Sequence, residues 1–200
     1  MQLIPHATDP GAYTAADEVI DHHHPVVRAT AAALRARAGD DLAYARAAYH
    51  HVRDRIPHSA DTGDDRVTWR ASDVLTLETG ICHAKSHALA ALLRAEGIPT
   101  GLCYQRLADE DGGNPLVHGL VAVLFPGRAD WARQDPRGNV PPGVDARFSP
   151  DTERLAWTVR PAVGEVDYPL LYATPPVPVL DALRHSADRE ELWRRLPTAL

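Results

Sequence analysis

The sequence predicts a domain of the α+β class, with helices in its first half and strands after them. Alanine- and leucine-rich segments with helix-capping signals extend to residue 96, and alternating or valine-rich runs begin after Pro99. Because helices and strands are segregated rather than interleaved, the pattern favours α+β over βαβ units. The 200 residues, 44% of them hydrophobic, suffice for a substantial core. We expect one domain over residues 1–200, with its core at about 40–160 and an N-terminal helical segment and a proline-rich C-terminal tail packed on it.

Helical patterns cover residues 15–56, with a break at Gly39. Asp40 follows the break and is a typical N-cap for the second helix. A polar loop and a further short helix come next, and that helix is expected to begin at Ser72 or Asp73. The expected boundaries are 26–38 and 42–52 for the first two helices, 57–66 for the loop, and an end near Gly80 for the short helix.

The clearest helix is predicted from Cys82 to Glu96, where Gly97 ends it. It is apolar nearly all round, and a helix of that kind is usually buried in a core. Its narrow polar stripe consists of His83, His87 and Arg94. Cys82 lies in its first turn.

Strand patterns follow this helix, bounded by proline and glycine. Prolines are dense after residue 160, so we expect the tail to wrap the surface before a last helix. The expected strands are Thr100–Leu107, Leu116–Phe125 and 128–136, with short strands at Phe148 and Leu155–Val159, and the last helix is expected near Val179–Arg195.

Charge and hydropathy exclude several classes of function. The net charge is −6 and no basic run is present, which argues against nonspecific nucleic-acid binding. No apolar run approaches the roughly 20 residues of a membrane span. Residues 1–13 lack the basic and apolar regions of a signal peptide. We therefore expect a cytoplasmic protein with no nucleic-acid or membrane partner and with its two cysteines reduced.

The order of three residues along the chain points to thiol chemistry. Cys82 follows a glycine turn at a helix start, where N–H groups favour the reactive thiolate. His118 and Asp135 follow on two successive predicted strands, and an antiparallel pair would bring them together. A histidine could then exchange the proton, and an aspartate could orient its ring.

At these residues the chain resembles the transglutaminase-like superfamily, and in particular its bacterial single-domain and cysteine-protease branch. The resemblance covers roughly residues 17–180. Its central motifs are Gly80-Ile81-Cys82, Lys85-Ser86-His87, Leu92 through Pro99, Val117-His118-Gly119, and Trp131 through Asp135-Pro136. Segments 52–59, 101–107 and 142–150 resemble the family as well. The chain departs from many relatives at Glu78, where they carry glycine, and at Leu120, where they carry tryptophan.

The resemblance implies a papain-like transglutaminase core and a Cys82, His118 and Asp135 triad. Cys82 would attack an amide or peptide bond, and water or an amine would resolve the acyl-enzyme. Hydrolysis is favoured, because no residue pattern identifies an amine-binding pocket. The oxyanion would be held by the N–H of Cys82 and a second donor, for which Gln105 and Tyr104 are the candidates. The expected substrate is a peptide, a protein or a small amide, and no cofactor is implied.

Two hypotheses of other classes remain open from the residues alone. The chain could be a noncatalytic binding module that keeps the fold. It could also hold a metal, because His83 and His87 have i,i+4 spacing and His118 could add a third nitrogen ligand. However, no glutamate follows His83 as in zinc-protease helices. Cys103 is expected to pack in the core, with a redox bridge to Cys82 as the alternative.

Overall fold

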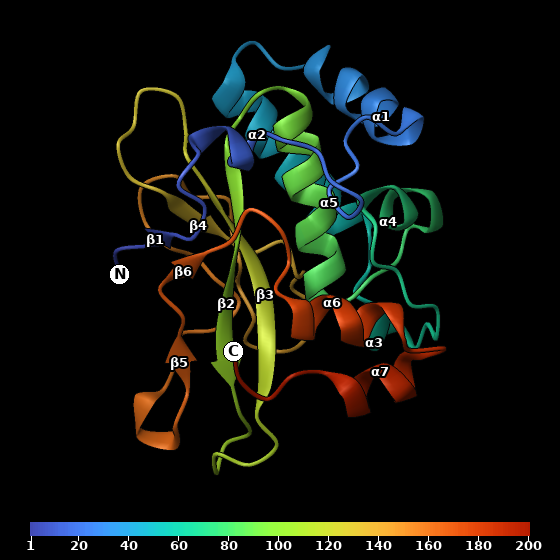
Figure 1. Cartoon of the computed structure of the whole chain (residues 1–200), viewed down its shortest axis with the longest axis vertical. Helices are drawn as coiled ribbons and strands as arrows, with labels where there is room; N and C mark the ends of the chain where they lie inside the picture. Colours follow the sequence, from blue (N-terminus) through green and yellow to red (C-terminus); the bar gives the residue numbers. More distant parts are fainter.

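The computed structural model describes all residues 1–200 and confirms the α+β class. A four-stranded antiparallel sheet in the order β4-β3-β2-β5 lies beside the long central helix α5 (Figure 1). A second, two-stranded sheet pairs β1 with β6 in parallel. The elements in chain order are β1 (Ile4–Pro5), η1 (Pro10–Tyr13), α1 (Pro25–Arg35), α2 (Asp41–His50), η2 (His51–Arg55), α3 (Ser59–Thr62), α4 (Ala71–Leu77), α5 (Cys82–Ala95), β2 (Thr100–Leu107), β3 (Leu116–Val123), β4 (Ala132–Gln134), η3 (Pro161–Val163), β5 (Val166–Asp167), β6 (Leu170–Leu171), α6 (Val177–Arg184) and α7 (Arg189–Arg195).

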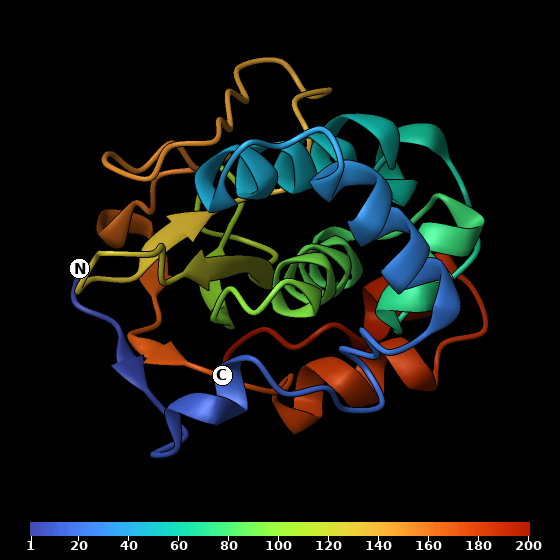
Figure 2. The same cartoon turned by 90° about the horizontal axis from the view of Figure 1, so that it is seen from above.

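Helix α5 is buried along its length, as its sequence predicts. Figure 2 looks along this helix, with α1 and α2 on one side and the strands next to it. The helix ends as expected at Gly97, which has a left-handed φ of 75°. The N–H of Ile98 then bonds back to the C=O of Leu93, which is the six-to-one bond of a Schellman cap. The predicted polar stripe is also buried. The Arg94 guanidinium tolerates this burial because it donates to the carbonyls of three other segments.

The register of the sheet leaves part of one strand edge uncovered. β2 pairs with β3 over its whole length, from Thr100 opposite Val123 to Leu107 opposite Leu116. β4 is short and pairs only with residues 121–123 of β3. The edge of β3 before residue 121 is therefore available to the first turn of α5.

A glycine permits this close approach of helix and strand. A β-carbon added at Gly119 of β3 would lie 2.5 Å from Nδ1 of His83 in α5. No side chain fits in that space, so glycine lets the start of the helix rest on the strand. Gly119 is thus required by packing between the two elements that carry the Cys and His of interest.

The N-terminal predictions are correct in part. Asp40 caps α2, with its carboxylate accepting the N–H of Ala43 at 2.7 Å. Residues 15–24 are not helical, contrary to expectation. The N-cap of α4 is Arg70, without a side-chain bond, so neither Ser72 nor Asp73 is the cap.

The end of α4 has an unusual backbone conformation. Glu78 has a left-handed φ of 50° at the C-cap of this helix. That conformation favours glycine and is uncommon for a residue with a β-carbon.

The strand predictions after residue 145 are wrong. Residues 155–159 form a loop because the N–H of Ala156 binds the carboxylate of Asp135, 3.1 Å away, and not a neighbouring strand. Phe148 is also outside any strand and packs its ring against Tyr49 and Phe125. The edge next to β2 is taken instead by β5 in the tail.

The last helix is two helices, not one. α6 ends at Arg184, and Asp188 starts α7 by accepting the N–H of Glu191 at 2.8 Å. Glu191 in turn accepts the N–H of Ala187, which completes a capping arrangement that sets the boundary.

Candidate active site

Cys82 is the first residue of α5 and lies at an uncapped helix N-terminus. Its N-cap is Ile81, which is extended and has no side-chain oxygen to bond the first N–H groups. The chain before it is fixed by a β-bridge between His58 and Gly80, with the N–H of Ser59 bonding the Gly80 carbonyl at 3.1 Å. The partial positive charge of the helix start therefore acts on the thiol.

His118 and Asp135 form a buried hydrogen-bonded pair on neighbouring strands. Nε2 of His118 in β3 lies 2.8 Å from Oδ2 of Asp135, which directly follows β4. Asp135 also accepts the backbone N–H groups of Arg137 and Ala156, both at 3.1 Å. The hydroxyl of Tyr49 donates to the Asp135 carbonyl at 2.9 Å. The structure thus brings together the two residues that the strand order places side by side.

The three groups shift one another's pKa values so that each group favours its charged form. Burial alone would raise the pKa of Cys82, but the charge of His118 and hydrogen bonds from its side chain and from the Gly119 N–H lower it. For His118, burial lowers the pKa, but the charges of Asp135 and Cys82 outweigh this and raise it to about 10. Burial opposes ionisation of Asp135, yet His118 and the two N–H donors lower its pKa. The arrangement therefore favours a thiolate, an imidazolium and a carboxylate together.

A cleft of about 1000 Å³ opens over these groups. Cys82 and His118 both line it. The ring of Trp157 meets His118 edge to face, with the centroids 5.1 Å apart, and Trp193 contributes a half-exposed wall from α7. A cleft of this size can take an extended peptide segment or a smaller amide.

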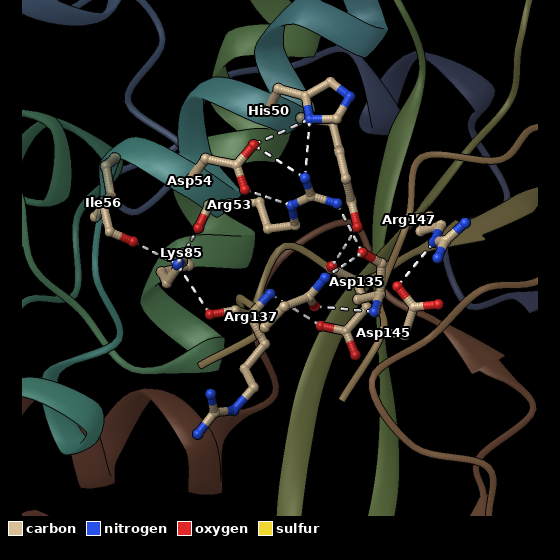
Figure 3. A network of polar contacts seen from close by, with 12 residues as sticks. His50, Arg53, Asp54, Ile56, Lys85, Asp135, Arg137, Asp145 and Arg147 are labelled. Atoms are coloured by element: carbon tan, nitrogen blue, oxygen red, sulfur yellow. Dashed lines mark hydrogen bonds and ion pairs between the residues drawn. The ribbon is translucent and has the colours of Figure 1, made fainter. Parts of the chain in front are cut away.

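A buried lysine holds the segment that follows Asp135, and its burial lowers its pKa to about 7. Lys85, one turn after Cys82 and the chain's only lysine, donates from Nζ to the carbonyls of Ile56 at 2.5 Å, Arg137 at 2.9 Å and Arg53 at 3.3 Å (Figure 3). The Arg137 guanidinium forms a two-pronged ion pair with Asp61. Sequence reasoning named Lys85 only within a family motif and gave it no role, although a lone lysine in an otherwise buried helix is a signal.

The two expected oxyanion donors do not line the cleft. The Gln105 amide nitrogen already donates to Asp167 at 2.9 Å and to the Trp157 carbonyl at 3.4 Å. Tyr104 is buried, with its ring 5.9 Å from that of His83. The cleft does contain His58, which sequence reasoning assigned to a loop without a role.

The histidines of the metal hypothesis lie inside the core, with both ring nitrogens of His83 and Nε2 of His87 lacking a hydrogen-bond partner. His83 and His87 are buried in α5, and burial lowers the pKa of the first to about 3 and of the second to about 4. No group of three or more histidine, cysteine, aspartate or glutamate side chains is placed to hold a metal ion. Cys82 and Cys103 are both free thiols.

Comparison with known proteins identifies the family. The model of the transglutaminase-like superfamily matches residues 28–136, which is more than half of the chain. The chain belongs to the transglutaminase-like superfamily. The matched segment includes Cys82, His118 and Asp135, and the family predicted from the sequence is confirmed.

One solved structure shows the same fold at low sequence identity, and two others match with lower scores. A Cytophaga hutchinsonii protein named "Putative Cysteine Protease" superposes with a TM-score of 0.52 and 17% identity, over 66% of this chain and 43% of that one. The periplasmic domain of TgpA from Pseudomonas aeruginosa gives 0.45 and 22%, over 65% and 48% of the two chains. A structure described as a TGase gives 0.43 and 14%, over 76% and 42%.

This superfamily member therefore spans less than half the length of the solved structures it matches. No curated protein matches the chain. None of its helices has the length and apolar character that crossing a membrane requires.

Proposed function

We propose that the protein is a thiol-dependent acyl-transfer enzyme that cleaves an amide or peptide bond through an acyl-enzyme on Cys82. The observation that carries the proposal is the buried His118–Asp135 pair beside a cysteine at an uncapped helix start. A purely structural histidine and aspartate would have no need of a thiol with a lowered pKa next to them.

The proposed steps use the charges that the site favours. The Cys82 thiolate forms a bond to the acyl carbon, and the C=O electron pair moves onto oxygen. The C–N bond then breaks as the His118 imidazolium gives its proton to the leaving amine. Asp135 keeps the ring oriented and stabilises its cation. His118, now neutral, takes a proton from the incoming water or amine, whose oxygen or nitrogen bonds to the thioester carbon. The C–S bond then breaks and its electron pair goes to sulfur, which restores the Cys82 thiolate beside the His118 imidazolium.

Hydrolysis is the favoured outcome of the second half-reaction. Water needs no dedicated binding pocket. An amine acceptor needs a pocket that holds it near the acyl-enzyme, because otherwise water reacts first. No residue pattern of the chain singles out an amine-binding pocket. Transfer to an amine uses the same first half-reaction, so one experiment separates the two.

The test is mass spectrometry of the protein after incubation with p-nitrophenyl acetate at neutral pH. We expect an acetyl group on Cys82 that decays with time, and no acetyl group there in Cys82→Ala. Added hydroxylamine or a primary alkylamine identifies the acceptor. If the product remains free acetate, hydrolysis is supported, and if the alkylamine is acetylated quantitatively, amine transfer is supported. Acetylation of Cys82 no faster than that of Cys103 would contradict the proposal.

A further inference from the structure

An acyl-transfer site of this kind needs two donors for the oxyanion, and only one is evident. The backbone N–H of Cys82 makes no hydrogen bond within the protein, because it belongs to the uncapped first turn of α5. A single donor leaves much of the developing charge unsupported. A second N–H must therefore point into the cleft near the thiol.

His58 is placed for this by a contact with the segment that carries Cys82. It lies between η2 and α3 and forms a parallel β-bridge with Gly80, two residues before the cysteine. Its side chain is only 5% exposed and lines the same cleft as Cys82 and His118. The ring therefore borders the cleft that Cys82 and His118 also line, which is the space a substrate would enter.

The hydrogen bonds of His58 fix which ring nitrogen carries the proton. Nδ1 accepts the N–H of Ala60 at 3.3 Å, where His58 is the N-cap of α3. A nitrogen that accepts a bond from an amide is unprotonated, so the proton of the neutral ring is on Nε2.

The surroundings of His58 keep this ring neutral. Burial first, and then the positive charges of Arg137, Lys85 and His118, hold its pKa well below the ordinary value. Neither ring nitrogen has a protein acceptor in the structure, so the Nε2–H is unused.

We infer that Nε2–H of His58 is the second oxyanion donor, acting together with the backbone N–H of Cys82. The inference rests on the proposed function and names a further catalytic residue for it. As the Cys82 sulfur bonds to the acyl carbon, the C=O electron pair becomes an oxyanion that accepts both N–H bonds. When the amine leaves, the pair returns to form the C=O of the thioester and the two bonds weaken. His58 keeps its proton throughout, since a neutral imidazole is a poor acid.

Two reactions of the same thiol separate this role from a structural one. Iodoacetamide alkylates Cys82 at a saturated carbon and forms no oxyanion, whereas p-nitrophenyl acetate acylates it through one. Removing an oxyanion donor typically lowers the rate on the order of 10² to 10³-fold. We expect His58→Ala to lower acylation by about that factor and to leave alkylation within about twofold.

Two further variants control for folding. His58→Asn keeps an oxygen that can cap α3 but has a shorter side chain that withdraws the donor from the cleft. It should keep the melting temperature and still lose acylation. His24→Ala is the matched control, because Nδ1 of His24 likewise caps a helix, α1, by accepting the N–H of Val26 at 3.4 Å, yet this residue does not line the cleft. Both reaction rates should be unchanged in that variant.

The outcomes distinguish the inference from the function on which it rests. If wild-type Cys82 is acylated no faster than Cys103, the proposed function is wrong and the inference fails with it. If wild-type Cys82 is acylated rapidly and folded His58→Asn keeps the same rate, only the inference is overturned. Equal losses of acylation and alkylation would also overturn it, because they would show that His58 supports the thiolate and not the oxyanion.

Discussion

The two cysteines of this chain are both buried and both free, yet their surroundings act on them in opposite directions. Cys82 sits at the N-terminus of α5 with His118 beside it, and its pKa is lowered although burial opposes this. Cys103 lies in the middle of β2, opposite Leu120 of β3, and burial raises its pKa far above the ordinary value. Burial alone makes a thiol inert, and a nearby cation with free N–H groups reverses the effect.

The comparison also shows that the sheet separates the two thiols. Cys103 packs with Tyr13, Leu120 and Leu171 in a small apolar cluster on one side. The first turn of α5 meets β3 on the other, through Gly119. The chain thus contains its own reference thiol, buried in the same protein but without the charges of the site.

The largest expected effect is the loss of turnover when Cys82 is removed, with removal of Cys103 as the control. Cys82→Ala should lower acyl transfer on the order of 10⁵-fold, because loss of a nucleophile in a coupled set removes nearly all chemical catalysis. Cys103→Ala should change it by less than about twofold. The measurement is initial rate against p-nitrophenyl acetate, with melting temperatures to show that Cys82→Ala stays folded. Retained turnover in Cys82→Ala would eliminate the thiol mechanism.

Asp135→Asn should have the next largest effect. The neutral asparagine amide cannot balance the positive charge of the His118 imidazolium. Its NH₂ group can also hold the neutral His118 ring in the wrong tautomer, so kcat should fall by roughly 10² to 10⁴-fold. Loss of the imidazolium should also return the Cys82 pKa toward its ordinary value. Asp145→Asn is the matched control, because this carboxylate is exposed and pairs only with Arg147. Equal activity of the two variants would show that Asp135 has no role in catalysis.

Lys85→Met should affect stability more than chemistry. The substitution leaves the carbonyls of Ile56, Arg137 and Arg53 without their donor, at a cost of about 1–3 kcal/mol for each buried group. Removing the buried charge offsets part of this loss, so we expect unfolding free energy to fall by about 2–4 kcal/mol. Chemical denaturation measures it. A stabilised Lys85→Met would show that the three carbonyls find other donors.

Cys103→Ala should have the smallest effect, on stability alone. It removes one sulfur atom from a packed apolar cluster, and a small cavity of this kind costs about 1–2 kcal/mol. Cys103→Ser should be less stable than Cys103→Ala, since a buried hydroxyl there lacks a partner. Denaturation curves of both variants test this, and a more stable serine variant would show that the site is polar.

The sequence predicted those parts of the candidate site whose positions depend on neighbouring residues. Cys82 follows a glycine turn at the start of a buried helix, and His118 and Asp135 belong to successive strands, so their meeting needs only one antiparallel pair. The helix cap at Gly97 and the N-cap at Asp40 were likewise predictable from adjacent residues.

The parts that were missed depend on contacts between distant segments. His58 reads as a loop residue, and only its bridge to Gly80 brings it to the cleft. Residues 155–159 look like a strand, but the Ala156 N–H is taken by Asp135. Lys85 bonds carbonyls 29 to 52 residues away, which no periodicity reveals.

The most direct test of the account is the pH dependence of alkylation by iodoacetamide at each cysteine of the wild-type protein. The pKa of Cys82 is lowered, so its thiolate should form at a lower pH than that of an ordinary thiol. The His118 imidazolium that stabilises it should be lost as the pH rises through about 10. Mass spectrometry of peptides gives both rates in one sample. We predict a Cys82 rate at pH 7 at least about tenfold above that of Cys103, and a rise of the Cys82 rate with pH whose midpoint lies below the ordinary thiol range. A Cys82 rate that rises through the ordinary thiol range near pH 8.5, and is no faster than Cys103 at pH 7, would contradict the account.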